Sequence, residues 1–354
     1  MKRVVVLYGG RSSEHPISCL SARSVLEAVD RDRYEVLAVG ITRDGRWTLT
    51  SGTIEALDGR TLPEVADDGR TVALVGTRHG PQLVGLEDDS TPAEALGPVD
   101  VAFPVLHGPW GEDGTVQGLL ATVGVPYVGA DVTASSIGID KVAMKASFAV
   151  RGLPQGAYVP VERTRWAADP VAVAAEVQRT LPLPWFTKPA RQGSSIGISK
   201  VRDPRELPEA MAHALHYDDV AIVEEGLERP RELEVGVLGH EDLDVTAPGE
   251  IVPVHDFYDF DAKYLDASEL IVPAQLPTAV AAEMDRISRE AYRAIGCRGM
   301  ARVDFLLGAD GRLLLNEINT IPGFTPKSMF PLLWAAEGLD YPALVDRLLA
   351  SAAT

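Results

Sequence analysis

The segment ARVDFLLGADGRLLLNEINTIPG, residues 301–323, constrains the fold more than any other part of the chain. Two apolar runs flank Asp310 and Gly311. The Asp-Gly dipeptide is a strong signal for a two-residue hairpin loop, because glycine accepts the positive φ of a type I′ turn. We therefore predict a β-hairpin that closes at this dipeptide and places Ala309 opposite Arg312.

The predicted hairpin brings acidic side chains together within apolar strands. Counting back from the turn, Asp304 falls opposite Glu317 and Arg302 opposite Asn319. The strand period of two then puts all four side chains on one face. Two unpaired carboxylates in such positions repel by roughly a few kcal/mol at an effective dielectric of about 20, so a cation is expected between them. An oxygen-donor set without His or Cys suits Mg²⁺. The alternative is a solvated face with an Arg–carboxylate pair.

Length and charge limit the possible partners. The chain has 354 residues, which favours two or three domains. Its formal net charge of −18 argues against nucleic acid and anionic membranes as partners, so a phosphate site must depend on a few local Lys and Arg. Two distant cysteines, Cys19 and Cys297, indicate a reducing compartment. The first apolar run is too short for a signal peptide and no run is long enough to span a bilayer, so we expect a cytoplasmic protein.

The order of the apolar runs predicts an α/β fold. RVVVLYGG, SARSVLEAV and YEVLAVGIT read as strand, helix and strand, which is typical of a doubly wound parallel sheet. We expect residues 51–98 to be an insertion of short strands and loops, and VPYVGA, residues 125–130, to be a strand. The predicted domains are residues 1–129, 130–227 and 228–354.

A glycine- and serine-rich loop, KPARQGSSIGISK, could cover phosphates with its backbone N–H groups. Lys188 precedes the glycines and the residues after them alternate as in a strand, so the segment reads as a hairpin flap and not as a Walker A loop. Lys141, in the first turn of a helix capped by Asp140, opposes the helix dipole and so points to an anion partner. The alternatives are an ordinary surface hairpin and a solvated lysine.

Three further loops carry candidate polar groups. In YGGRSSEHPIS a glycine pair and a helix N-terminus suit a carboxylate, and Glu14 and His15 are the polar side chains on offer. His107 ends a strand, where it could orient a substrate; a loop histidine without a role fits equally well. HDFYDFDAKYLD has the composition of a lid, with Lys263 and Tyr264 as its functional tips, or else of an Asp-rich surface loop.

Taken together and in order, these segments resemble the D-alanine:D-alanine ligases of the ATP-grasp superfamily. The motifs that carry the resemblance are HGPWGEDGT, KPARQGSSIG, FDAKY and ARVDF…NEINTIPGFT, and the match runs from Tyr8 to Pro331. The resemblance implies a three-domain ATP-grasp fold with ATP between the central and C-terminal domains. It also implies synthesis of D-alanyl-D-alanine through a D-alanyl phosphate, with release of ADP and phosphate, for peptidoglycan precursors.

The resemblance assigns nucleotide and metal ligands by position. Two Mg²⁺ or Mn²⁺ ions would bind Asp304, Glu317 and Asn319, and a monovalent cation such as K⁺ is a further expectation. The residues implied to contact ATP are Lys141, Lys188, Ser195, Glu224, Leu227, Glu232 and Lys263, of which Lys263 would reach the γ-phosphate.

The resemblance also implies how the two D-alanines are held. Glu14 would receive the ammonium group of the first D-alanine, and His107 would lie near its carboxylate. Ser328 would hold the carboxylate of the second D-alanine.

The remaining implied roles concern the oxyanion and the lid. Arg302 and the backbone N–H of Gly323 would stabilise the tetrahedral oxyanion. Ser194 and Tyr264 would link with Glu14 to close the lid, which would exclude water from the acyl phosphate.

The chain departs from the family pattern at several positions. Pro16 stands where an acid is common, Gln192 where Glu is usual, and Gly226 in place of a bulkier residue near the adenine. The 224–232 segment is one residue longer, so Glu232 is the least direct of the transferred assignments.

Other functions remain open at this point. One is a D-alanine:D-lactate or D-alanine:D-serine ligase, although FDAKY with Tyr264 resembles the dipeptide-forming type. Another is an ATP-grasp ligase for different amino acids, and a third is a nucleotide-binding regulator without turnover, against which the predicted metal ligands argue. The expected partners are D-alanine, ATP and a second copy of the chain bound through the N-terminal domain.

Overall fold

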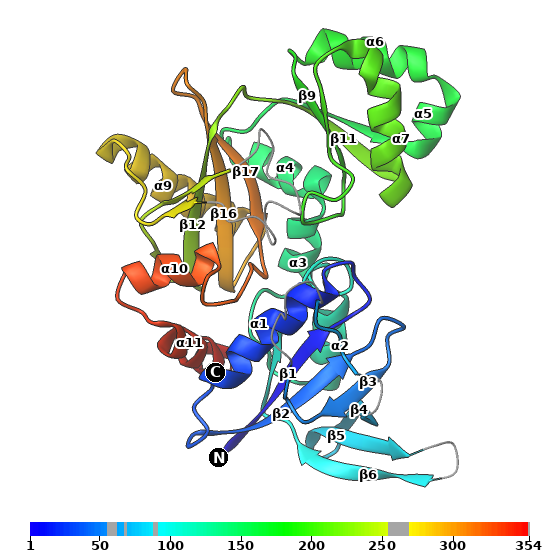
Figure 1. Ribbon diagram of the computed structural model, residues 1–354, viewed down its shortest axis with the longest axis vertical. Coiled ribbons are helices and arrows are strands. Elements are labelled where there is room, and N and C mark those ends of the chain that lie inside the picture. Colours follow the sequence, from blue (N-terminus) through cyan, green and yellow to red (C-terminus); the bar gives the residue numbers. More distant parts are fainter. Residues whose placement is uncertain (55–61, 67–68, 88–90, 254–268, 353–354) are drawn as a thin grey trace.

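The computed structural model describes residues 1–54, 62–66, 69–87, 91–253 and 269–352. The described strands form three sheets, each with its own helices (Figure 1). In that view the first sheet lies at the lower end in blue and cyan, the second at the upper right in green, and the third at the upper left in olive to orange. This arrangement confirms the α/β prediction.

The first sheet has the strand order β6-β5-β4-β3-β2-β1-β7. Its elements are β1 (Lys2–Gly9), α1 (His15–Ala28), β2 (Tyr34–Ile41), β3 (Trp47–Thr50), β4 (Arg70–Thr77), β5 (Gly80–Glu87), β6 (Thr91–Pro98), β7 (Val101–Pro104) and α2 (Thr115–Val123). Strands β2, β1 and β7 are parallel, as predicted. Strands β3 to β6 continue the sheet as an antiparallel meander, so the described part of the 51–98 segment extends the sheet.

The prediction of a strand at 125–130 is wrong. Within this fully described segment, Tyr127 forms an isolated parallel bridge with Ala102, and no named strand develops. A short apolar run is compatible with a strand and with a buried extended loop, and the sequence pattern alone does not separate them.

The second sheet has the strand order β10-β9-β11-β8. Its elements are β8 (Tyr158–Glu162), α5 (Arg163–Ala168), α6 (Pro170–Thr180), β9 (Trp185–Pro189), β10 (Ser199–Val201), the 3₁₀ helix η1 (Pro204–Glu206), α7 (Leu207–Tyr217) and β11 (Val220–Glu225). Strands β9 and β10 are antiparallel and are joined by residues 190–198, which we call the flap. Lys188 therefore lies on the strand that leads into the flap, as predicted.

The third sheet has the strand order β15-β14-β12-β16-β17, with β13 paired to β12. Its elements are β12 (Arg231–Gly239), β13 (Leu243–Val245), β14 (Gly249–Val252), β15 (Glu269–Ile271), α9 (Thr278–Ala294), β16 (Gly299–Leu307), β17 (Leu313–Asn319), α10 (Met329–Ala336) and α11 (Tyr341–Ala352).

Two helices precede the second sheet in the chain but lie between the sheets: α3 (Val132–Ile139) and α4 (Lys141–Val150) (Figure 1). Asp140 caps α4 as predicted, because its carboxylate accepts hydrogen bonds from the first backbone N–H groups of the helix. Met144 and Phe148 of α4 are fully buried and belong to the core of the third sheet. The buried face of α4 therefore reaches the boundary between the second and third sheets.

The turn of the β16–β17 hairpin differs from the prediction. Gly308 N donates to Arg312 O at 2.9 Å, and Gly311 N donates to Gly308 O at 3.0 Å. The loop thus has three residues, and the predicted pairing of Ala309 with Arg312 is wrong. Gly311 has a φ of +83°, the left-handed conformation that ends such a loop.

The register at the far end of the hairpin is nevertheless as predicted. A β-bulge at Asn316 offsets the longer turn by one residue. Asp304 therefore lies opposite Glu317, and Arg302 lies opposite Asn319.

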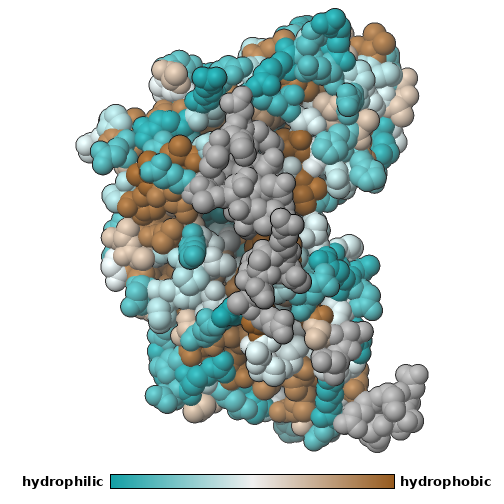
Figure 2. All heavy atoms as spheres, in the orientation of Figure 1, coloured by the Kyte–Doolittle hydropathy of each residue, from teal (hydrophilic) through white to brown (hydrophobic). Residues whose placement is uncertain are grey.

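The surface is mixed in character. On the face shown in Figure 2, hydrophilic residues are prominent over the upper right part, which holds α5, α6 and α7. Among the described residues, no helix combines the length and the apolar character needed to cross a membrane.

Candidate active site

A cavity lies between the second and third sheets. Its volume of about 420 Å³ is within the usual range for a small-molecule site. Predicted site residues that line it are Lys141, Lys188, Ser194, Ser195, Glu224, Leu227, Glu232, Arg302, Asp304 and Glu317. Five others lie beyond this lining: Glu14, His107, Asn319, Gly323 and Ser328. Lys263 and Tyr264 fall outside the described residues.

One wall of the cavity holds a carboxylate between two ammonium groups. Glu224 on β11 lies 3.0 Å from Lys145 Nζ and 2.5 Å from Lys188 Nζ, and all three side chains are largely buried. Burial alone would raise the pKa of Glu224, but the two lysines outweigh this effect and hold the pKa at about 2. Burial alone would lower the pKa of Lys188, but Glu224 above all raises it. We call these three residues the lysine cluster.

A second wall, from β12, β16 and β17, holds an arginine among acids. Arg302 donates from Nε and Nη2 to the two carboxylate oxygens of Asp304, each at 2.7 Å, and its Nε lies 3.0 Å from Glu234 Oε2. Burial opposes the charge on Arg302, but Asp304, Glu234 and Glu317 raise its pKa well above the usual value. We call Glu234, Arg302, Asp304 and Glu317 the arginine cluster. The Arg–carboxylate pair is present, but it is buried, unlike the solvated alternative.

The donor chemistry of the hairpin fits a hard cation. Asp304, Glu317 and Asn319 offer oxygen atoms, and a carboxylate has about four lone-pair sites, so Asp304 can accept from Arg302 and still bind a cation. Asn319 Oδ1 accepts from Ile321 N at 3.0 Å and retains a second lone pair. Among the described residues, no group of three or more His, Cys, Asp or Glu is arranged to hold a metal. A cation here would therefore need oxygens from water and phosphate, as Mg²⁺ commonly does.

The flap joins the cavity to the first sheet. Ser194 and Ser195 have φ values of +49° and +58°, in the left-handed region that residues with side chains seldom adopt. Ser194 Oγ donates to the Glu14 carboxylate, just before α1. Lys141 Nζ donates to Gln192 O at 2.7 Å, and the Lys141 side chain is buried, so it is not a solvated lysine.

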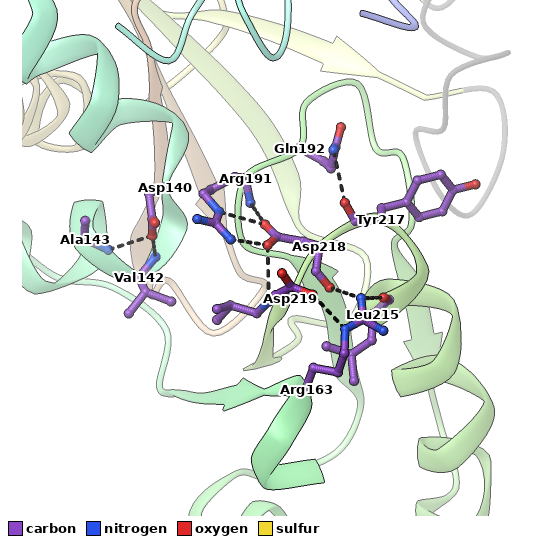
Figure 3. Close-up of polar contacts among 11 residues, drawn as sticks. Asp140, Val142, Ala143, Arg163, Arg191, Gln192, Leu215, Tyr217, Asp218 and Asp219 are labelled. Carbon is purple, nitrogen blue, oxygen red and sulfur yellow. Dashed lines mark hydrogen bonds and ion pairs between the residues drawn. The ribbon is translucent and has the colours of Figure 1, made fainter. Parts of the chain in front are cut away.

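An ion pair between the exposed Arg191 and the buried Asp218 holds the base of the flap (Figure 3). Asp218 accepts from Arg191 N at 2.9 Å and Nε at 3.0 Å, and also from Nη2. Its carboxylate also accepts from Val220 N at 3.2 Å. Burial alone would raise the pKa of Asp218, but Arg191 and these backbone N–H groups lower it overall. The start of the flap, just after β9, is therefore held against the short segment between α7 and β11.

One departure from the family pattern has a steric cause. Gly226 follows β11, and its N–H donates to Pro184 O at 2.7 Å. A Cβ atom at this position would lie 2.7 Å from the ring of Phe186, so a larger residue would require the ring to move. Leu227 is buried and, like Phe186, lines the cavity, which gives this end an apolar character suited to a flat ring.

His107 lies in the loop after β7, which ends at Pro104 and so three residues before the predicted end at His107, and it contacts the loop after β17. Its Nε2 lies 3.0 Å from Ser21 Oγ, and its Nδ1 lies 3.1 Å from Ile321 O and 3.5 Å from Glu112. Burial lowers the pKa of His107, but Glu112 and, less strongly, Glu14 outweigh this and raise it. These contacts hold the histidine in place, and its role toward a substrate stays a prediction.

The loop between β17 and α10 is held by its own hydroxyl groups. Ser328 Oγ accepts from Thr325 N at 3.1 Å and lies 2.9 Å from Thr325 Oγ1. A Cβ atom on Gly323 would come within 3.2 Å of Ser328 Oγ, so a larger residue at 323 would press on that hydroxyl. The two predicted residues Gly323 and Ser328 are thus brought together.

The sequence reasoning missed Lys145 and Glu234, which complete the two clusters. Lys145 falls on the buried face of α4 together with Lys141 and Met144, at helical spacing. A second lysine on an apolar stripe, four residues after the first, was the available signal. Glu234 lies within β12, and it meets Arg302 because β12 pairs with β16. The sequence pattern does not show this pairing, so it gave no signal for Glu234.

Comparison with known proteins identifies the family to which this chain belongs. Residues 3–130 match the family described as D-ala D-ala ligase N-terminus, and residues 147–350 match D-ala D-ala ligase C-terminus. A D-alanine–D-alanine ligase from Mycobacterium sp. (strain KMS) is 50% identical over 365 residues, covering 99% of this chain and 96% of the relative. The enzyme of that name from Streptomyces avermitilis is 49% identical over 365 residues, covering 99% and 94%.

Solved structures agree on the fold. A D-Ala:D-Ser ligase from Enterococcus faecalis matches with a TM-score of 0.83 at 31% identity, covering 99% of both chains. The D-alanine-D-alanine ligase from Coxiella burnetii matches with a TM-score of 0.82 at 30% identity, covering 99% of this chain and 94% of the other. The architecture is thus that of the ATP-grasp ligases, as predicted. The chain belongs to the D-alanine–D-alanine ligase family.

Proposed function

We propose that the protein joins two D-alanines to D-alanyl-D-alanine through a D-alanyl phosphate, with conversion of ATP to ADP and phosphate. The observation that carries the proposal is a single cavity with lysines on one wall and oxygen donors on the other. The flap over this cavity reaches Glu14 in the first sheet through Ser194. This arrangement suits a phosphoryl transfer to an amino acid bound between the first sheet and the flap.

ATP would lie with its base near Leu227 and its phosphates near the flap. Leu227 and Phe186 form an apolar end, and Glu224 and Glu232 offer acceptors for adenine and ribose hydroxyl groups. Lys141, Lys188 and the backbone N–H groups around Ser195 would neutralise and cradle the phosphates. Glu317, Asp304 and Asn319 would hold two Mg²⁺ ions, with a monovalent cation such as K⁺ as a possible addition. Bound Mg²⁺ neutralises charge on the transferred phosphoryl group.

The amino acids would lie between the first sheet and the loop after β17. The buried Glu14 carboxylate would bind the ammonium group of the first D-alanine, and His107 would attract its carboxylate. Ser328 would hold the carboxylate of the second D-alanine, whose amine attacks the acyl phosphate. The oxyanion that forms would be stabilised by Arg302 and the N–H of Gly323.

The test is ADP release against a panel of D- and L-amino acids, with mass spectrometry of the product. We expect ADP and phosphate to form with D-alanine in step with D-alanyl-D-alanine, and hydroxylamine to trap the acyl phosphate. L-alanine is the matched control and should give no dipeptide. ATP hydrolysis without dipeptide would contradict the proposal.

A second candidate is a D-alanine:D-serine or D-alanine:D-lactate ligase, because one of the structural matches is a D-Ala:D-Ser ligase. The curated relatives with higher identity carry the dipeptide name. Competition between D-alanine, D-serine and D-lactate in one reaction separates these functions. A product in which the second residue is mainly serine or lactate would replace our first choice.

We further propose three domains over residues 1–129, 130–227 and 228–354, assembly as a homodimer through the first, and cytoplasmic synthesis of peptidoglycan precursors. The exposed apolar side chain of Leu119, on α2 of the first domain, supports the dimer. Light scattering of the purified protein measures the assembly, and a mass of one chain at micromolar concentration would rule the dimer out.

A further inference from the structure

The lysine cluster contains one more cation than its carboxylate requires. Glu224 has one negative charge, and both Lys145 and Lys188 contact it. The two lysines differ in exposure: the Lys145 side chain is 3% exposed and that of Lys188 is 14% exposed. Lys188 is therefore the lysine that an anion in the cavity reaches more easily.

An ammonium group that turns toward a phosphate weakens its contact with its previous partner. If Lys188 were the only counter-ion of Glu224, ATP binding would leave a carboxylate buried without a compensating charge. Such a group is costly, because burial penalises an uncompensated charge strongly. The cost would appear as weaker ATP binding.

We propose that Lys145 is a positioning residue that keeps Glu224 neutralised, so that Lys188 is released to the phosphates of ATP. The inference rests on the proposed function, in which Lys188 contacts ATP. Lys145 itself stays on Glu224 and does not touch the transferred phosphoryl group.

The surroundings of Lys145 suit a fixed counter-ion. Its Nζ lies 5.6 Å from the centre of the Tyr158 ring, on the strand that pairs with β11, and the ring face attracts a cation. Its backbone carbonyl accepts from Gln155 Nε2 at 2.9 Å. The helix around it is anchored in the core of the third sheet by Met144 and Phe148.

The experiment measures the affinity for a non-hydrolysable ATP analogue, with Mg²⁺, by calorimetry on the full-length protein. We expect Lys145→Met to weaken binding about tenfold or more, whereas Lys145→Arg, which keeps the charge, stays within about threefold. Glu224→Gln, which keeps an oxygen acceptor for the nucleotide, should restore part of the affinity in the Lys145→Met background, because no carboxylate is then left uncompensated. This rescue is a coupling between two sites, which a loss of folding would not produce.

Lys200→Met is the matched control. Lys200 also lines the cavity and lies over an aromatic ring, that of Phe186 at 5.6 Å, but its acidic partner is Glu228. Glu224→Gln should not rescue Lys200→Met. Melting temperatures confirm that each variant is folded.

The outcomes separate the inference from the proposed function. No binding of the analogue by the wild-type protein would contradict the proposed function. Normal wild-type binding together with unchanged affinity in Lys145→Met, or with no rescue by Glu224→Gln, would overturn the role of Lys145 alone.

Discussion

The two walls of the cavity use different cations against buried carboxylates. In the arginine cluster, the fork of Arg302 binds both oxygens of Asp304 at once. In the lysine cluster, each ammonium group makes a single contact with Glu224. A planar fork is a directional, two-point contact, whereas an ammonium group is a point charge on a flexible stem. The arginine wall is thus built to keep its geometry, whereas the single contacts of the lysine wall fit our proposal that Lys188 exchanges partners when phosphates bind.

The largest effect is expected when one of the oxygen donors on the arginine wall is removed. Glu317→Ala should lower turnover by at least about a thousandfold, because charge neutralisation worth several kcal/mol is lost with the cation. The fold should be unaffected, as measured by circular dichroism and melting temperature. Mg²⁺ titration of the activity is the direct measurement, and a variant with an unchanged Mg²⁺ dependence would remove Glu317 from the proposed metal site.

A smaller effect is expected when the guanidinium group of Arg302 is replaced by an ammonium group. Arg302→Lys keeps the positive charge, but a lysine cannot bind both oxygens of Asp304 and at the same time donate a hydrogen bond to an oxyanion. We expect kcat to fall about a hundredfold, with a smaller change in KM for ATP. The matched control is Arg231→Lys, which removes another fork in the same sheet, the pair with Glu250 at 2.7 and 2.6 Å. Equal losses of kcat in the two variants would mean that the arginine wall has only a structural role.

The sequence predicted the arginine wall better than the lysine wall, for a physical reason. A hairpin is local, so an Asp-Gly signal and a period of two were enough to place Asp304 opposite Glu317. The predicted turn was one residue too short, and the bulge at Asn316 compensated for that error. Neither deviation is visible in the pattern, because a three-residue loop and a two-residue loop share the same glycine signal.

The lysine cluster depends on contacts between distant segments. Lys145 is on a helix that packs against the third sheet, and Glu224 is on a strand of the second. Local periodicity places Lys145 on a buried face but cannot say which acid it meets there. The family resemblance supplied Glu224 and Lys188, but not the third member of the cluster.

A third arginine–carboxylate pair, Arg191 with the buried Asp218 at the base of the flap, extends the comparison to a more exposed arginine. Asp218→Asn removes the charge that Arg191 binds, so the flap should be less well positioned and kcat/KM for ATP should fall about tenfold, equivalent to about 1.4 kcal/mol. Cleavage within residues 190–198 by a protease should become faster. Asp219→Asn is the control, because that carboxylate is exposed and pairs with Arg163 at 2.8 Å on the surface. A variant with wild-type kinetics would show that the flap does not depend on this pair.

The same variant has a predicted pH signature. Because the pKa of Asp218 is lower in the folded protein than its ordinary value, its contribution to stability is present above that value, near pH 4, and is lost as the pH falls through the folded pKa. The difference in unfolding free energy between wild type and Asp218→Asn should therefore shrink below about pH 4. A constant difference would argue that the charge is not what stabilises the pair.

The smallest expected effect concerns Gln192, where this chain departs from the family pattern. Within the described residues, its side-chain Nε2 makes a long contact of 3.5 Å with Tyr217 O (Figure 3). The contact that matters for Lys141 is made by the backbone carbonyl of Gln192, which a substitution leaves in place. Gln192→Glu should therefore change kcat and KM for ATP by less than about twofold, as expected for a partly exposed side chain whose contact within the described residues is long. A change above about fivefold would show that the side chain also positions the flap. The stability of the flap would then depend on more than the Arg191 fork and the Lys141 ammonium group.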